Sequence, residues 1–342
     1  MESRRRTHPR ADHKHPILAR LGTFDQEGRI EANLSNRTAV SSESQPEYID
    51  NSSYHQTDDG QSYQRLLHQS ALFERHRRRD GRSVRDTYCS WSRRRIMKTV
   101  PPHRDAYGQQ MWAFLNGGSP IEVVERDDGF VSTAHSNATY FADIRQWSAI
   151  ERRAIQFARG RTALDVGCGA GRVALHLQSK GYRVTAIDNS PLAIKTARTR
   201  GVKHARLFPL ENIGQLSSGS LDTIVMFGNN FGLFGNRRRA RILLKQLHRI
   251  TRDRAVLLAQ SLNPHATSEP AHLDYQRRNR RRGRMAGQIR LRIRFNQWIG
   301  PWFDYLLVSP GEMSDILDGT GWEVDRFLTE NGPRFVAIVR RV

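Results

Sequence analysis

Three glycines and an aspartate are grouped at the point where a short apolar stretch gives way to a helical pattern. They form the segment Asp165-Val-Gly167-Cys168-Gly169-Ala-Gly171. Glycines let the backbone turn sharply and approach a ligand without a Cβ in the way. The amino end of the helix that follows presents free N–H groups, which favour a bound carboxylate. The segment therefore predicts a site for a zwitterionic group, with Asp165 placed to accept from an ammonium.

A second carboxylate, Asp188, lies 17 residues after Gly171, just past the next expected strand. A carboxylate at that place can accept two hydrogen bonds from a ribose diol. Dinucleotide-binding enzymes use the same arrangement, but their glycines are spaced G-x-G-x-x-G. Here the spacing is G-x-G-x-G after an aspartate, and the additional acid suits an amino acid better than a pyrophosphate. A dehydrogenase, or a chance match on a protein that is not an enzyme, is the alternative.

The chain resembles the class I S-adenosylmethionine-dependent methyltransferases over roughly residues 105–342. The resemblance is carried by the segments 164–172, 186–191 and 221–231. It implies methyl transfer as the reaction and S-adenosyl-L-methionine as the cofactor. The histidines of the chain form no recognisable metal-ligand spacing, so no metal is expected.

The resemblance also implies a set of residues around the cofactor. Asp188 would hold the ribose, Asn189 would lie against the adenine, and Glu211 or Asn212 would lie near the adenine amino group. The candidate cofactor-binding residues are Asp165, Gly167, Cys168, Gly169, Gly171, Asp188, Asn189, Glu211, Asn212, Gly228 and Asn229.

Residues 228–230 follow the fourth strand of the pattern and would face the methyl group and the substrate. They depart from the Asn/Asp-Pro-Pro-Tyr type of motif found in methyltransferases of nucleobase amino groups, which argues against DNA-adenine methylation. Asn230, Tyr140 and Tyr275 are the substrate candidates. The alternative interpretation is a loop cap for Asn230, plain core for Tyr140 and a solvated loop for Tyr275. No catalytic base is identified, because a base is needed only where the acceptor must lose a proton.

The elements that must position these residues alternate along the chain. Helical spacings cover 106–115, 143–159, 172–180, 191–200, 237–251 and 310–317, and strand patterns cover 121–125, 162–166, 182–187, 205–208, 221–227, 255–261, 288–295, 302–308, 322–328 and 335–339. Buried strands that alternate with helices predict an α/β fold with a doubly wound, mostly parallel sheet. The last two strands are expected to form an antiparallel edge pair.

An Arg-rich insertion over about residues 263–300 interrupts this alternation. Long insertions in a compact domain are usually functional or disordered. We expect the arginines of 277–284 to belong to a lid over the substrate side. The alternative function is an RNA or DNA methyltransferase that uses them on phosphates, and a third is a cofactor-binding protein without catalysis.

Arginine dominates the charge of the chain. Lys and Arg number 55 against 34 Asp and Glu, a formal net charge of +21, and only six of the basic residues are lysine. Such an excess can indicate nucleic-acid binding, but an excess of arginine over lysine also reflects a GC-rich genome. With no separate nucleic-acid-binding module in the sequence, a small-molecule acceptor is favoured over nucleic acid. Nothing in the sequence indicates the oligomeric state.

Residues 1–98 differ in composition from the rest of the chain. Only 14 of them are Leu, Ile, Val or Phe, too few to offset the entropy of ordering. We expect a disordered basic extension before a methyltransferase domain over 99–342. An alternative interpretation is that the native protein starts near Met97. Two cysteines and no long apolar stretch favour a soluble, cytoplasmic protein without membrane partners.

Overall fold

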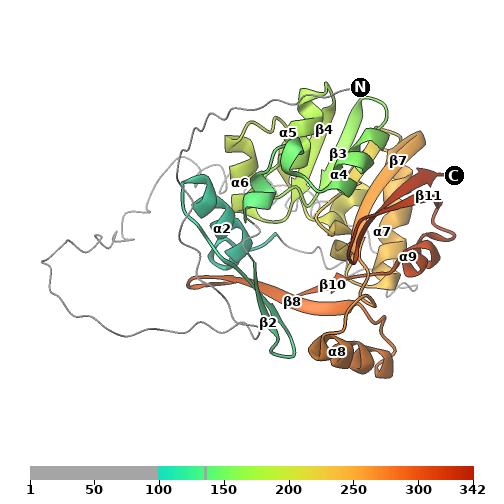
Figure 1. Ribbon diagram of the computed structural model, residues 1–342. Coiled ribbons are helices and arrows are strands. Elements are labelled where there is room, and N and C mark those ends of the chain that lie inside the picture. The colour runs from blue at the N-terminus through green and yellow to red at the C-terminus, as the bar shows by residue number, and fades with distance from the viewer. Residues whose placement is uncertain (1–98, 135–136) are drawn as a thin grey trace, which may run out of the picture. The chain divides into compact units, whose positions relative to one another are not determined.

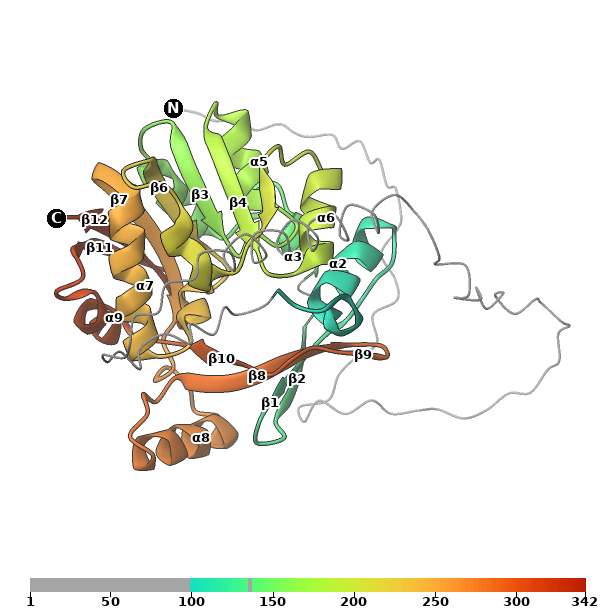
Figure 2. The same ribbon diagram turned by 180° about the vertical axis from the view of Figure 1, so that it is seen from behind.

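The structure is a computed structural model that describes residues 99–134 and 137–342. The predicted disordered extension over 1–98 lies outside the described residues. Within them, a large sheet with helices on both faces stands above a smaller sheet (Figures 1 and 2). No helix among the described residues is long and apolar enough to cross a membrane.

The large sheet has seven strands in the order β11-β12-β7-β6-β3-β4-β5. Strands β7, β6, β3, β4 and β5 are parallel, whereas β12 runs antiparallel to both β7 and β11. Their bounds are β3 Thr162–Val166, β4 Arg183–Asp188, β5 Ala205–Leu207, β6 Leu221–Met226, β7 Thr251–Leu262, β11 Trp322–Thr329 and β12 Arg334–Arg341. The predicted α/β class, parallel centre and antiparallel edge pair are confirmed.

Helices cover both faces of this sheet, as expected of a doubly wound fold. One core joins the sheet to α7 (Arg237–Ile250) and α9 (Pro310–Leu317). The other joins it to α4 (Ala149–Ala154), α5 (Arg172–Ser179) and α6 (Pro191–Thr199). In α7 the buried side chains recur every three or four residues, which is why one stripe of an otherwise basic helix packs on the sheet.

The predicted long helix over 143–159 is wrong. The structure divides it into η4 (Ile144–Gln146), α4 and η5 (Ile155–Phe157). Asp143 caps η4 through a capping box, and Ser148 then caps α4 afresh by accepting from the N–H of Glu151. Side-chain oxygens that bind the backbone in this way start a new helix, so the periodic pattern spans three short pieces.

A second, antiparallel sheet lies below the first and was not predicted as a unit. Its order is β10-β8-β1-β2, with β9 paired to β8. The strands are β1 Glu122–Arg126, β2 Val131–Ala134, β8 Gln288–Phe295, β9 Trp298–Ile299 and β10 Phe303–Leu306. It therefore combines the β1–β2 hairpin with β8 and β9 of the Arg-rich insertion and with β10, which follows the insertion. We call it the small sheet.

The remaining elements connect the two sheets. Helix α2 (Ala106–Leu115) lies between them and packs against α6 and β8 (Figure 1). The shorter pieces are η3 (Pro102–Arg104), α3 (Asn137–Phe141), η6 (Leu210–Gln215) and η7 (Asn230–Phe234). The Arg-rich insertion also contains a helix that the polar sequence did not suggest, α8 (Pro270–Arg281). Arg278 of α8 forms an ion pair with Asp128 in the turn of the β1–β2 hairpin.

Candidate functional site

The glycine segment is a tight loop at the carboxyl end of β3. Gly167, Gly169 and Gly171 have φ angles of 68°, 50° and 83°, in the region where a side chain is strained. A Cβ on Gly169 would lie 2.9 Å from the hydroxyl of Tyr107, and one on Gly167 would lie 2.7 Å from Nδ2 of Asn230. The loop therefore has no room for a side chain at either position, as the sequence predicted.

Asp188, at the end of the neighbouring β4, reaches this loop directly. Its Oδ2 accepts from the backbone N–H of Gly169 at 3.0 Å, and its Oδ1 accepts from that of Ser190 at 3.0 Å. The residue is 8% exposed, and burial raises its pKa to about 6. A carboxylate offers about four acceptor positions, so the two oxygens keep capacity for a diol. The structure thus brings Asp188 and the glycine loop together.

Asp165, at the end of β3, holds the amino end of α5. Its Oδ2 accepts from the N–H of Ala174 in the first turn of α5 at 3.1 Å, and it is 3% exposed. Burial raises its pKa to about 7, although the nearby charge of Arg172 acts in the opposite direction. The carboxylate therefore fastens the amino end of α5 under the loop. Acceptance from a ligand's ammonium stays a prediction.

The loop after β6 lies beside the glycine loop, and Asn230 joins the two. Its Nδ2 donates to the carbonyl oxygens of Val166 at 2.8 Å and Gly167 at 2.9 Å. Asn229 adopts a left-handed φ of 62°, and its buried Oδ1 has no hydrogen-bond partner among the described residues. The N–H of Gly228 donates to Oε1 of Gln260 at 2.5 Å. Asn230 therefore serves loop packing here, and its contact with substrate stays a prediction.

The remaining predicted cofactor residues lie around the same end of the sheet. Cys168 is buried in the glycine loop, whereas Asn189 is exposed and its carbonyl accepts from the N–H of Val100 at 2.9 Å. Glu211, half-buried in η6, forms an ion pair with Arg239 of α7, and Asn212 is half-buried beside it. Their contacts with adenine stay predictions.

The two tyrosine candidates are placed differently. The hydroxyl of Tyr140 donates to Oε2 of Glu122 at 3.0 Å, and its ring lies edge-on to that of Tyr107, which reaches the glycine loop. Tyr275 lies in α8, where its hydroxyl donates to Asp127 at 2.6 Å and accepts from the N–H of Arg290. Tyr275 therefore fastens α8 to the hairpin, and the structure does not bring it to the glycine loop.

Sequence reasoning missed the residues that α2 contributes. Asp105 is buried and accepts from the N–H of Gly108 at 2.9 Å, the hydroxyl of Ser190 at 2.8 Å and the N–H of Leu192 at 3.0 Å. These bonds hold α2 over the end of β4, with Tyr107 above Gly169. An aspartate just before a helical run is an N-cap signal, but only the fold gives it partners in a second element.

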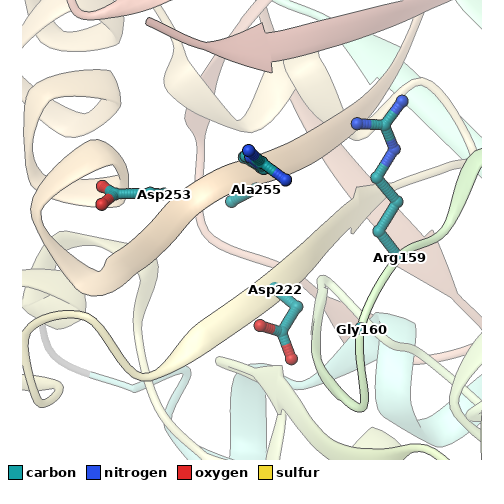
Figure 3. A pocket seen from close by; sticks show the side chains of 6 residues that line it. Arg159, Gly160, Asp222, Asp253 and Ala255 are labelled. Carbon is teal, nitrogen blue, oxygen red and sulfur yellow. The ribbon is translucent and has the colours of Figure 1, made fainter.

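A pocket at the opposite edge of the large sheet is unrelated to this site. It encloses about 270 Å³ and is lined by Arg159, Gly160, Asp222, Asp253, Arg254 and Ala255 (Figure 3). Asp222 lies near the start of β6, and its carboxylate already accepts from Thr162 at 2.7 Å and from Arg252 at 2.9 Å. Hydrogen bonds from these groups and backbone N–H groups hold its pKa well below the usual range against the effect of burial. The carboxylate of Asp222 is therefore already occupied by hydrogen bonds within the protein.

The chemistry of the glycine loop end fits a nucleoside that carries an amino acid. Asp188 supplies the acceptors that a ribose diol needs, and the glycines admit close approach of a ligand. The site lies outside the carboxyl ends of β3, β4 and β6, where open α/β sheets bind their ligands. The residues present therefore match the cofactor that the sequence resemblance implies.

Comparison with known proteins gives a family for part of the chain. Residues 163–254 match the sequence profile described as a methyltransferase domain. A methyltransferase of Geobacillus sp. (strain WCH70) is 25% identical over 131 residues, which are 37% of this chain and 52% of that protein. The ubiquinone biosynthesis O-methyltransferase of Xanthomonas oryzae pv. oryzae (strain PXO99A) is 34% identical over 70 residues, 19% of this chain and 29% of that protein. The chain thus spans about half the length, or less, of these curated relatives.

A solved structure extends the likeness to most of the described residues. It is an S-adenosylmethionine-dependent methyltransferase from Bacteroides fragilis, solved in complex with S-adenosyl-L-homocysteine. It is 24% identical, with a TM-score of 0.61, and the match covers 72% of this chain and 98% of that one. At this identity the likeness establishes the fold.

Proposed function

We propose that this chain, which contains a methyltransferase domain over residues 163–254 on a class I methyltransferase fold, is an S-adenosylmethionine-dependent methyltransferase that acts on a small molecule. The observation that carries the proposal is the pairing of Asp188 with the N–H of Gly169 at the carboxyl ends of the parallel strands. In this pairing the carboxylate that we assign to the ribose is one hydrogen bond from the loop that would hold the amino acid.

The residues of this chain would contribute to the reaction by holding the cofactor and the acceptor in place. When bound, the cofactor supplies a methyl group on a positively charged sulfur. Asp188 would hold the ribose, the glycine loop would receive the amino acid, and the loop of Gly228 and Asn229 would lie beside the methyl group. Holding two reactants in line is worth several orders of magnitude in rate, so the rigidity that Asn230 and Asp165 give these loops serves the reaction.

A small-molecule acceptor is supported by what covers the site. Helix α2 and the small sheet lie over the carboxyl ends of the strands (Figures 1 and 2), and such a cover favours an acceptor smaller than a duplex. The name of the Xanthomonas relative also refers to the biosynthesis of a small molecule.

Two measurements test the proposal. In calorimetry the full chain is expected to bind S-adenosyl-L-homocysteine and not NAD; binding of NAD alone would replace the proposal by a dehydrogenase. The protein is then incubated with methyl-labelled cofactor and host extract, and the label is fractionated into small molecules, protein and nucleic acid. We expect the label in the small-molecule fraction.

A nucleic-acid methyltransferase is the second candidate, and one observation favours it. Arg281, Arg282 and Arg284, at the end of α8 and just beyond it, are exposed and form no ion pair within the described part of the chain. Arginines that neutralise phosphates release counterions, so binding weakens steeply with salt. We expect activity to change little between about 50 and 200 mM salt; a fall of about a hundredfold or more, with label in nucleic acid, would favour this candidate.

A further inference from the structure

The small sheet has one apolar face and one charged face. Residues directly opposite each other in an antiparallel pair project to the same side of the sheet. The register pairs Val124 with Ile293, Leu291 with Phe303, and Ile289 with Tyr305. One face therefore carries Val124, Ile289, Leu291, Ile293, Phe303 and Tyr305, together with Glu122 and Arg126, which lie two residues before and two residues after Val124 on β1. The charge of Arg126 is paired with Asp128 in the hairpin turn. The other face carries Glu125, Arg290, Arg292, Arg294 and Asp304, with Val123 and the buried Leu306 among them.

The apolar face is the one turned towards the glycine loop. The hydroxyl of Tyr305 donates to the carbonyl oxygen of Asn229 at 2.6 Å, and its ring packs against Gly232. At the other end of the face, Nε2 of Gln110 in α2 donates to Oε2 of Glu122 at 2.8 Å. The apolar face thus contacts both the loop after β6 and α2, on the side of the site on which an acceptor would lie.

Glu122 brings a carboxylate onto this apolar face. It is 7% exposed and accepts from the hydroxyl of Tyr140 as well as from Gln110. Tyr107 lies beside Tyr140, and their ring centroids are 5.7 Å apart. Burial raises the pKa of the Tyr107 phenol well above its usual value, and Tyr140 and the charges of Asp188 and Glu122 act in the same direction. Glu122 therefore lies beside a pair of tyrosines, one of which, Tyr107, also contacts the glycine loop.

Gln110 gives a second, independent indication of a ligand. The residue is fully buried, yet its Oε1 has no hydrogen-bond partner among the described residues. Since Nε2 donates to a carboxylate, the orientation of the amide is fixed and Oε1 must be the free acceptor. Asn229, whose carbonyl oxygen accepts from Tyr305, also has a buried Oδ1 without a hydrogen-bond partner among the described residues. Buried acceptors without donors are costly and call for a donor.

We infer that the space between the small sheet and the glycine loop is the acceptor site, and that its acceptor is an amine with an apolar body. The inference rests on the proposed function and names its substrate class. Glu122 and Oε1 of Gln110 receive the N–H groups of the acceptor, since an ammonium has three donors and no acceptor. The tyrosine rings favour a cation beside them, and the apolar face receives the hydrocarbon. An anionic acceptor would face Glu122 and be repelled.

Three probes of one shape test this inference on the full chain. They are 2-phenylethylamine, 2-phenylethanol and 3-phenylpropionate, each titrated by calorimetry in the presence of saturating S-adenosyl-L-homocysteine. The amine is expected to bind at least about tenfold more tightly than the alcohol and the acid, because hydrogen bonds to a charged group are worth that much. Binding none of them at millimolar concentration, or binding the alcohol or the acid as tightly as the amine, overturns the inference.

Two glutamates on β1 provide a matched pair of variants. Glu122→Gln removes the charge on the apolar face and is expected to weaken amine binding about tenfold while leaving alcohol binding unchanged. Glu125→Gln removes a charge from the opposite face, where the carboxylate pairs with Arg292 and Arg294, and should leave both affinities unchanged. A Glu122→Gln variant that keeps the amine preference overturns the inference.

Titration of the unaltered chain with S-adenosyl-L-homocysteine comes first, and it distinguishes a failure of the proposed function from a failure of the acceptor class. A chain that does not bind it defeats the proposed function itself. A chain that binds it but shows no preference for the amine defeats only the acceptor class. Should Glu122→Gln melt below the assay temperature, the comparison of the three probes on the unaltered chain decides alone.

Discussion

At the scale of single residues, Asp188 is the residue of the candidate site whose orientation is best defined by hydrogen bonds. Both of its oxygens hold backbone N–H groups, so its carboxylate is oriented before any ligand arrives. Replacement by Ala removes the contacts to the ribose diol, and we expect a loss of about 1.5–3 kcal/mol in the binding free energy of S-adenosyl-L-homocysteine. Calorimetry on the variant measures this, and unchanged affinity would contradict the assignment of Asp188 to the ribose.

The protonation of Asp188 leads to a pH prediction for the ligand. Burial raises its folded-state pKa to about 6, and the diol is held by the ionised form. Affinity for S-adenosyl-L-homocysteine should therefore increase as the pH rises from about 5 to about 7 and level off above it, by up to about tenfold per unit below the pKa. Titrations across this range measure it, and a flat profile would count against the prediction.

The stability of the ligand-free protein should follow the opposite course. The folded-state pKa values of Asp165 and Asp188, about 7 and about 6, exceed the ordinary value of 3.8. The folded protein then binds protons that the unfolded chain releases, so these groups stabilise the fold fully below about pH 4. That contribution is lost as the pH rises through about 6 to 7. Melting curves with and without S-adenosyl-L-homocysteine should therefore separate further as the pH increases.

At the scale of elements, α2 is positioned by one carboxylate. Asp105 links the helix to Ser190 and Leu192 beyond β4, and it is buried. Asp105→Ala removes these bonds, and we expect the free energy of unfolding to fall by about 1.5–3 kcal/mol. Because Tyr107 and Gln110 depend on this link for their place, S-adenosyl-L-homocysteine should also bind more weakly.

Hydrogen exchange distinguishes a local effect from a global one. In the Asp105→Ala variant the amides of α2 should exchange faster than expected from the loss of global stability alone. The amides of β3 and β6 should exchange faster only by the amount that the loss of global stability predicts. A matched control is Asp143→Ala, which removes the cap of η4 and should leave α2 unchanged. Uniformly faster exchange throughout the domain would contradict the view that Asp105 serves mainly to hold α2.

At the scale of the whole molecule, every residue of the candidate site lies within residues 99–342, which we predict to be the methyltransferase domain. We expect a chain shortened to begin at Met97 to keep the melting temperature and the S-adenosyl-L-homocysteine affinity of the full chain, because residues 1–98 contain few core-forming side chains. Scanning calorimetry and titration of both chains provide the comparison. Loss of folding would place the domain boundary elsewhere, and loss of activity only on a polyanionic acceptor would assign the extension a role in recruitment.

The sequence by itself determined the centre of the fold. The glycine loop, Asp188 and the alternation of strands and helices are signals within short stretches of chain, and parallel strands joined by helices bring their carboxyl ends to one edge. That is why Gly169 and Asp188 could be predicted to belong to one site although they lie 19 positions apart in the sequence. The broken helix over 143–159 was missed because periodicity alone does not register a new cap at Ser148.

Only the tertiary structure decided what faces the glycine loop. Strands β1 and β8 pair although more than 150 residues separate them in the sequence. The side chains of Glu125 and Arg292 form a hydrogen bond although the two residues are 167 positions apart. No local pattern specifies such a pairing, because a strand with one polar and one apolar face can pair with many others. Glu122 and Glu125 look alike in sequence; the register of the small sheet turns one towards α2 and the other towards solvent-facing arginines. The proposed acceptor side of the site therefore results from long-range packing, whereas the cofactor side is encoded in the local sequence.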